Sequence, residues 1–240
     1  MPKSAIIIGG SGLVGKRLVE CLLKDDGISK VVSLGRRVID ADSVCPSCTT
    51  EQKAKFNSVV VDFLNLSSHR ETFKDQALGF CTLGTTRADA GSAEKFKEID
   101  YTYCLEFAKL YQEENKDKPT HFLLLTSGGS DANSFFLYPK TKGELERDCG
   151  KIGLDKLSIF RPGLLMFPEG ETRPGGRITE SVLQRIFPYV DWIAPSRLTA
   201  PTTVVASAMH KKALEPVVKS GTTNVEILEN KAILECGISS

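Results

Sequence analysis

The sequence predicts a doubly wound α/β fold with a parallel sheet, and three observations lead to this expectation. Short, nearly continuous apolar runs recur along the chain, which is typical of strands covered on both faces. Segments with helical spacing of apolar residues separate these runs and imply right-handed crossovers. A glycine-rich segment, residues 9–15, follows the first run directly. Because 240 residues suit one large domain, we expect residues 1–240 to form a single domain.

The expected elements alternate in chain order. The predicted strands are the six apolar runs at residues 5–8, 31–34, 59–61, 78–83, 122–125 and 157–160. Three helical patterns lie between them, with apolar positions at Leu18, Val19, Leu22 and Leu23 in the first, Phe96, Ile99, Tyr103 and Phe107 in the second, and a third over residues 138–149. We expect residues 36–57 to form a long connection or to contain a helix with a weak sequence pattern.

The alternation of apolar runs and helical patterns ends after Pro162, where proline and glycine become frequent. We expect residues 164–240 to contribute a small irregular lid on the substrate side of the sheet. Two helices are expected within it, around residues 181–187 and 203–214.

Composition excludes several classes of protein. The net charge of +1 gives no sign of direct nucleic-acid binding or of attachment to a membrane surface. The apolar run before Gly9 is too short for a secretory signal, and no run reaches the length of a membrane span. Seven scattered cysteines indicate reduced thiols in the cytosol. Cys45 and Cys48 form the C-x-x-C, but the further ligands of a metal site are missing, so neither a metal nor a redox role is favoured.

The stretch "IIIGGSGLVGKRL" places Gly9, Gly12 and Gly15 between a predicted strand and a predicted helix. Glycine permits positive φ in the turn, close approach to a pyrophosphate and close packing of helix on strand. Free amide groups at the helix N-terminus, aided by the helix dipole, favour phosphate. The pattern predicts a dinucleotide site of the Rossmann type, the alternative being a tight turn without a ligand.

Two arginines, Arg36 and Arg37, end the second predicted strand. An NAD site carries an acidic residue here for the ribose 2′-hydroxyl. Paired guanidinium groups suit a 2′-phosphate instead, so the sequence favours NADPH over NADH, although arginines at a strand end are often only solvated.

The third and fourth strands end in two further candidates. Asp62 could accept a hydrogen bond from the adenine amino group or cap a helix, and the sequence leaves both open. Gly84 follows the fourth strand, where bare backbone allows close approach of the ribose and nicotinamide.

A candidate catalytic set follows the fifth strand. Ser127 lies just beyond it, and Tyr138 and Lys142 come later at i, i+4 spacing, on one helix face. Carbonyl reduction needs a proton donor at oxygen, and tyrosine serves near neutral pH only when a cation stabilises its phenolate. Lys142 supplies that charge, and Ser127 polarises the carbonyl oxygen.

This ordered set resembles the short-chain dehydrogenase/reductase superfamily. Within it, "LGTTRADAGSAEKF", "HFLLLTSGGSD", "FLYPKTKGELE", "IFRPGLL", "ETRPGG" and "ILENKAI" resemble blocks of the Tat-interactive-protein oxidoreductases, an atypical branch. The resemblance covers nearly the whole chain, from residue 5 to about 233.

The resemblance implies specific cofactor contacts. It assigns NADPH binding to Ser11, Gly12, Leu13, Val14, Arg36, Arg37, Leu83, Gly84, Tyr138, Lys142, Leu165 and Arg173. Many superfamily members carry an asparagine on the fourth helix that anchors a proton-relay water. Here Asp100 and its neighbours stand near that place, so slow or vestigial turnover is expected.

We therefore expect an NADPH-dependent oxidoreductase of the carbonyl reductase type that acts on a small carbonyl substrate. The alternative is an NADPH-binding regulatory protein with little turnover, acting through protein partners in apoptosis, transcription or nuclear transport, as the resemblance implies. A sugar-nucleotide epimerase is a third possibility, but such enzymes usually retain NAD, and Arg36 and Arg37 argue against it. The expected location is the cytoplasm, with the nuclear envelope or nucleus as further sites.

Overall fold

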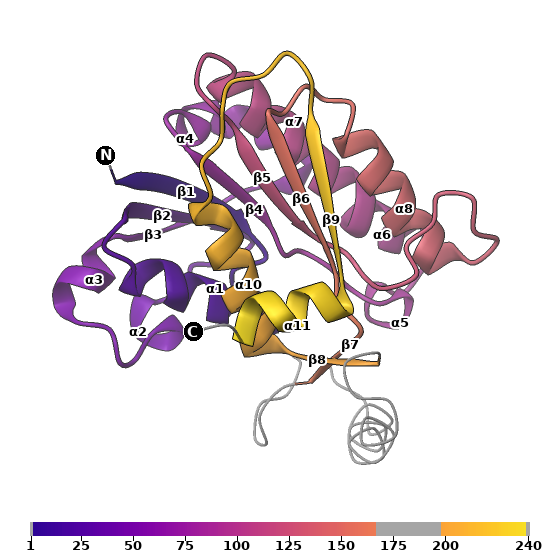
Figure 1. Ribbon diagram of the computed structural model, residues 1–240, viewed down its shortest axis with the longest axis horizontal. Coiled ribbons are helices and arrows are strands. Elements are labelled where there is room, and N and C mark those ends of the chain that lie inside the picture. Colours follow the sequence, from indigo (N-terminus) through magenta and orange to yellow (C-terminus); the bar gives the residue numbers. More distant parts are fainter. Residues whose placement is uncertain (1, 167–197, 239–240) are drawn as a thin grey trace.

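Seven parallel strands form the central sheet in the order β3-β2-β1-β4-β5-β6-β9 (Figure 1). The computed structural model describes residues 2–166 and 198–238. The strands are β1 (Lys3–Ile8), β2 (Ile28–Gly35), β3 (Phe56–Val60), β4 (Leu78–Cys81), β5 (His121–Leu125), β6 (Lys156–Arg161) and β9 (Asn224–Glu229). From β3 the chain returns to the other side of β1, so strand order reverses between β1 and β4. The doubly wound fold is confirmed.

Helices cover both faces of this sheet (Figure 1). One face carries α1 (Leu13–Lys24), α2 (Ala41–Val44), α10 (Thr202–Leu214) and α11 (Asn230–Ile238). The other carries η1 (Phe63–His69), α4 (Arg70–Phe73), α7 (Cys104–Asn115) and α8 (Leu137–Cys149). Three short elements lead into α7, namely α5 (Arg87–Ala90), α6 (Ala93–Lys97) and the π-helical η2 (Glu98–Tyr103).

Strand β1 shows why the apolar runs are unbroken. Ile7 points into the core under α1 and α10, while Ile6 and Ile8 point into the core under α7 and α8. All three are fully buried. Each buried isoleucine stabilises the fold by about 1.5–3 kcal/mol relative to an exposed one, so neither face tolerates the polar residues that half-exposed strands carry.

The C-terminal region differs from the expected lid. Helix α10 packs against α1, and β9 pairs in parallel with β6 along its whole length, from Lys156↔Asn224 to Arg161↔Glu229. Residues 202–238 therefore belong to the main layers. Beside them, β7 (Leu164–Met166) and β8 (Thr199–Pro201) form a small parallel pair. The helix expected around residues 181–187 and the candidate Arg173 lie outside the described residues.

Asn230, at the start of α11, ties this small sheet to the main body. Its Oδ1 accepts from the Gly163 amide at 2.8 Å, and its Nδ2 donates to the Thr199 carbonyl at 2.9 Å. The "IFRPGLL" and "ILENKAI" blocks are thereby joined.

The long connection after β2 contains two short helices, α2 and α3 (Thr50–Ala54). Asp40 caps the first, and Thr49 forms a capping box with Gln52 at the second. Cys45 and Cys48 lie between them as a disulfide, with Cα atoms 5.3 Å apart. The expectation that all cysteines are reduced is wrong for this pair, because the turn between α2 and α3 brings both Cα atoms within bonding range.

Among the helices of the described residues, none is long and apolar enough to cross a membrane.

Candidate active site

The carboxyl ends of the parallel strands open on one edge of the sheet, where strand order reverses between β1 and β4. Ligands of open α/β sheets bind at such a switch point. The candidates Gly9, Arg36, Gly84 and Ser127 follow β1, β2, β4 and β5, so the fold gathers them at this edge.

The turn after β1 accepts glycine alone at its first position. Gly9 has φ +83°, and a Cβ there would lie 2.5 Å from the Thr82 carbonyl carbon and from the Leu83 nitrogen. Thr82 holds this approach in place, because its amide and its hydroxyl each donate to the Ile8 carbonyl at 3.0 Å. The turn is thus pressed against the chain that leaves β4.

Helix α1 then begins without a cap of its own. A Cβ at Gly15 would lie 2.1 Å from the Gly9 carbonyl oxygen, so this turn of helix packs directly on the loop. Gly12 is the N-cap residue and offers no side-chain acceptor, and the first helical turn holds no acidic residue. The first amides of a helix have no partner within it, so those of Leu13 and Val14 are suited to an anion. We call this turn and the first amides of α1 the glycine cradle, and it fits a pyrophosphate.

Arg36 and Arg37 are exposed at the end of β2. Within residues 2–166 and 198–238, neither guanidinium group forms an ion pair or a side-chain hydrogen bond. Two guanidinium groups without a partner among the described residues are chemically suited to a phosphate group.

Asp62 is an exposed N-cap of η1, where its Oδ1 accepts from the Leu64 amide at 2.9 Å. The structure thus shows the helix cap, and a contact with adenine stays a prediction.

Tyr138 and Lys142 lie on successive turns of α8 in different surroundings. Tyr138 is 41% exposed, and its ring stacks on Phe96 of α6 with centroids 5.7 Å apart. Lys142 is buried. The phenol therefore reaches the site edge, while the ammonium lies beneath the surface.

A buried carboxylate, Asp100 of η2, meets Lys142. Its Oδ1 lies 2.6 Å from the lysine Nζ, and its Oδ2 accepts from the Thr85 amide at 2.8 Å. Burial lowers the pKa of Lys142, but the Asp100 carboxylate, with smaller contributions from Tyr138 and Cys104, raises that pKa above its ordinary value. A Cβ at Gly84 would lie 3.4 Å from Oδ1 and 3.5 Å from Nζ, so bare backbone covers the pair.

Sequence reasoning treated Asp100 only as a departure from the superfamily pattern. The sequence contains one signal that Asp100 is buried. Asp100 is four residues after Phe96 and four before Cys104, both fully buried, so it shares their helix face.

Ser127 is half-buried in the loop after β5. Among the residues that the structure describes, its Oγ makes one long hydrogen bond, 3.4 Å, to the Gly128 carbonyl. Two hydrogen bonds to backbone carbonyls fix the loop, since the Gly128 amide donates to the Pro162 carbonyl at 2.8 Å and the Ser130 Oγ donates to the Ser127 carbonyl at 2.7 Å. The hydroxyl is therefore held in place with most of its bonding capacity unused.

Leu83 and Leu165 are both partly buried. Leu83 packs on the core under α7 and α8, and Leu165, in β7, packs on the core under α1 and α10.

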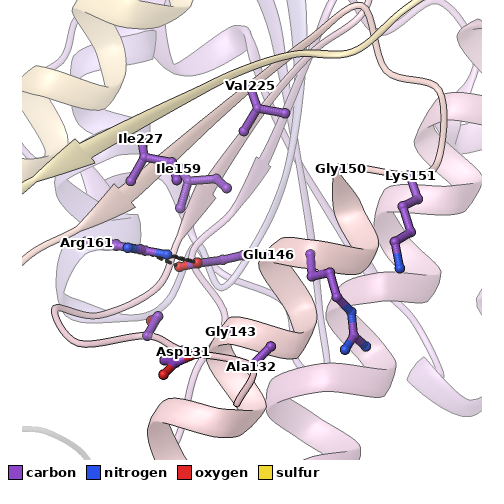
Figure 2. A pocket seen from close by; sticks show the side chains of 12 residues that line it. Asp131, Ala132, Gly143, Glu146, Gly150, Lys151, Ile159, Arg161, Val225 and Ile227 are labelled. Carbon is purple, nitrogen blue, oxygen red and sulfur yellow. Dashed lines mark hydrogen bonds and ion pairs between the residues drawn. The ribbon is translucent and has the colours of Figure 1, made fainter. Parts of the chain in front are cut away.

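A cavity of about 430 Å³ lies beside α8, between this helix and strands β6 and β9 (Figure 2). It does not include the catalytic candidates. At its base, Arg161 of β6 binds Glu146 of α8 with 2.5 Å between nitrogen and oxygen, and the Thr126 hydroxyl donates to Glu146 at 2.6 Å. Glu146, which sequence reasoning missed, thus fastens α8 to the ends of β5 and β6.

The chain is similar to known proteins in sequence and in fold. No family model matches the sequence. Protein HTATIP2 of Rattus norvegicus is 38% identical over 240 residues, which cover 99% of this chain and 90% of the relative. Protein FMP52, mitochondrial, of Candida albicans is 38% identical over 188 residues, covering 76% of this chain and 75% of the relative.

Solved structures share the fold at low sequence identity. A short-chain dehydrogenase/reductase from Mycobacterium ulcerans has a TM-score of 0.65 at 16% identity and covers 97% of this chain and 90% of its own. The YIR035C short-chain dehydrogenase/reductase of Saccharomyces cerevisiae has a TM-score of 0.66 at 15% identity, with coverages of 94% and 95%.

The relatives correct the expected location. Homologues from Candida albicans, Debaryomyces hansenii and Aspergillus oryzae are named as mitochondrial proteins. The expectation of a cytoplasmic or nuclear protein is therefore wrong, because the absence of a secretory signal does not distinguish the cytosol from mitochondria.

The identity to HTATIP2 is sustained over nearly the whole of both chains. The chain belongs to the family of the Tat-interactive protein HTATIP2, and it has the fold of the short-chain dehydrogenases/reductases.

Proposed function

We propose that this protein is an NADPH-dependent oxidoreductase of the carbonyl reductase type. The observation that carries the proposal is the cradle at Gly9 and Gly15 together with the guanidinium groups of Arg36 and Arg37, which have no partner in the described part of the chain, at the same sheet edge. A site for NADH would place a carboxylate where these arginines stand.

Each part of the cofactor has a candidate holder in this chain. The amides of the first turn of α1 suit the pyrophosphate, and the two arginines suit the 2′-phosphate. The bare backbone of Gly84, which lies next to Lys142, is the proposed contact for the ribose. The further proposed contacts are Ser11, Gly12, Leu13, Val14, Asp62, Leu83, Leu165 and Arg173.

NADPH held by these residues would supply the hydride that reduces the carbonyl group. Tyr138 donates its phenolic proton to the carbonyl oxygen, which completes the alcohol and leaves a tyrosinate. The Lys142 ammonium stabilises that tyrosinate, and the Ser127 hydroxyl donates to the oxygen while charge develops there. Because Tyr138 is 41% exposed, solvent can return its proton.

The test is cofactor titration of an Arg36→Ala/Arg37→Ala double variant. Losing charge-assisted hydrogen bonds worth about 1.5–3 kcal/mol each should weaken NADPH binding at least tenfold and leave NADH binding within about twofold. Lys30→Ala is the matched control, because Lys30 is exposed at the opposite end of the same strand. Equal losses for both cofactors, or no binding of either by the wild type, would overturn the proposal.

A second candidate function is a regulatory protein that binds NADPH with little turnover and acts through protein partners. The observation that favours it is the Asp100 carboxylate against Lys142, where many superfamily members use asparagine. Tyr138→Phe separates the two functions. If this variant still binds NADPH and restores the phenotype of cells that lack the gene, the regulatory function holds; if it binds but fails to restore, turnover is required.

We also propose a mitochondrial location, on the names of the fungal relatives. Fractionation of cells expressing the untagged protein tests it, and recovery outside the mitochondrial fraction would refute it.

A further inference from the structure

The contact between Phe96 and Tyr138 carries an inference that rests on the proposed function and extends it. We propose that Phe96 of α6 is a positioning residue, whose buried ring holds the Tyr138 ring in the orientation from which the phenol donates its proton. Neither the glycine cradle nor the Y-x-x-x-K spacing requires an aromatic residue at this place.

The rings of Phe96 and Tyr138 touch directly. They are stacked, with centroids 5.7 Å apart and an angle of 30° between their planes. Aromatic pairs at this separation attract each other by more than the area they bury would give. Phe96 is fully buried and Tyr138 is 41% exposed, so a fixed ring backs a phenol that still reaches solvent.

The Tyr138 hydroxyl makes no hydrogen bond within the described part of the chain. Other tyrosines are held by their hydroxyls. The Tyr101 hydroxyl donates to Asp148 at 2.9 Å, and the Tyr111 hydroxyl donates to the Ala77 carbonyl at 3.0 Å. Tyr138 therefore depends on its ring for a fixed position, which leaves its hydroxyl available to a substrate.

An ion pair keeps the Phe96 ring in place against α8. Asp100, in the η2 that continues α6, lies 2.6 Å from Lys142 of α8, and both side chains are buried. Phe96 is four residues before Asp100, and Tyr138 is four residues before Lys142. Two i, i+4 pairs thus face each other across the helices, one through rings and one through charges.

Packing on the sheet does not account for the burial of Phe96. The two buried clusters of the described residues, one under α1 and α10 and one under α7 and α8, do not include it. A second stacked pair, Phe63 and Tyr103, belongs to the cluster under α7 and α8, with centroids 5.2 Å apart. This second pair supplies a matched control.

Phe96→Leu tests the proposal directly, since it keeps an apolar side chain and removes the ring. The chain has five tyrosines, so protein labelled with 3-fluorotyrosine gives few fluorine NMR signals, and Tyr138→Phe identifies the signal of Tyr138. In Phe96→Leu we expect that signal to narrow and to move toward the position of free 3-fluorotyrosine. The other tyrosine signals should stay in place.

Phe63→Leu is the control, because it should move the Tyr103 signal and leave the Tyr138 signal at its wild-type position. A Tyr138 signal that stays in place in Phe96→Leu would overturn the proposal. A shift of all tyrosine signals would do the same, because it would show a general loosening of the fold. If Phe96→Leu does not fold, Phe96→Met is measured in its place, and failure of both to fold would assign Phe96 a purely structural role.

The catalytic consequence is measured with NADPH and 4-nitrobenzaldehyde as the probe. Misplacement of a reacting group by about 1 Å can cost about a hundredfold in rate. The kcat of Phe96→Leu should therefore fall at least tenfold, with KM and NADPH affinity within about threefold of the wild-type values, and Phe63→Leu should keep the wild-type kcat. An unchanged kcat in Phe96→Leu would contradict the positioning role.

The fluorine spectra are recorded without cofactor or substrate. A wild-type protein that does not reduce the aldehyde therefore counts against the proposed function alone, and in that case the fluorine signal of Tyr138 still decides the role of Phe96.

Discussion

Gly9 offers a sharp test of the cradle, because the chain contains a matched control. Gly9→Ala adds one methyl group at φ +83°, where it would lie 2.5 Å from backbone atoms of Thr82 and Leu83. Gly91→Ala adds the same group at φ +86°, where no heavy atom of the described residues other than its chain neighbours lies within 4 Å. Both variants bear the cost of left-handed backbone, about 1–2 kcal/mol. Only Gly9→Ala adds overpacking against backbone, a further cost of about 1–3 kcal/mol.

Urea unfolding followed by circular dichroism should therefore show a loss of about 1–2 kcal/mol in the free energy of unfolding for Gly91→Ala and about 2–5 kcal/mol for Gly9→Ala. Because relief of the clash moves the loop away from α1, NADPH affinity should fall at least tenfold in Gly9→Ala and remain unchanged in Gly91→Ala. Equal losses of stability in the two variants, or full NADPH affinity in Gly9→Ala, would refute the close approach between β1 and β4.

Two further predictions concern buried polar groups. Glu146→Gln should lower the free energy of unfolding by about 3 kcal/mol, because it breaks a buried pair with Arg161, whereas Glu229→Gln, at the exposed end of the same network, should cost less than about 1 kcal/mol in the same urea experiment. Burial lowers the pKa of His121 to about 3, so its stabilising contribution is complete above about pH 6.5 and is lost as the pH falls from there toward 3, by up to about 1.4 kcal/mol per unit. His121→Gln should flatten the stability profile in that window, and an unchanged slope would contradict the assignment.

The fold was largely predictable because most strands are buried on both faces. Strands β1, β2, β4, β5 and β6 read as apolar runs for this reason. Strand β9 escaped prediction because it lies at the sheet edge, where Val225 and Ile227 alternate with glutamates and stay about half exposed. Without β9, the C-terminal residues could only be assigned to a lid.

The residues of the site were likewise predictable only in part. Residues that directly follow a strand, such as Gly9 and Arg36, are positioned by topology alone, so sequence reasoning found them. Asp100 and Glu146 act through partners on other elements, and a single sequence contains no record of such pairings. The disulfide of Cys45 and Cys48 depends likewise on the shape of a turn that the apolar pattern does not specify.

The packing of α10 on α1 has a consequence for biosynthesis. The apolar side of α1, around Leu18 and Leu22, emerges early from the ribosome, whereas its cover, Thr202–Leu214, is translated far later. For most of translation the nascent chain therefore exposes the apolar side of α1 next to the glycine-rich turn. A chaperone that binds this apolar surface would protect the nascent chain from aggregation.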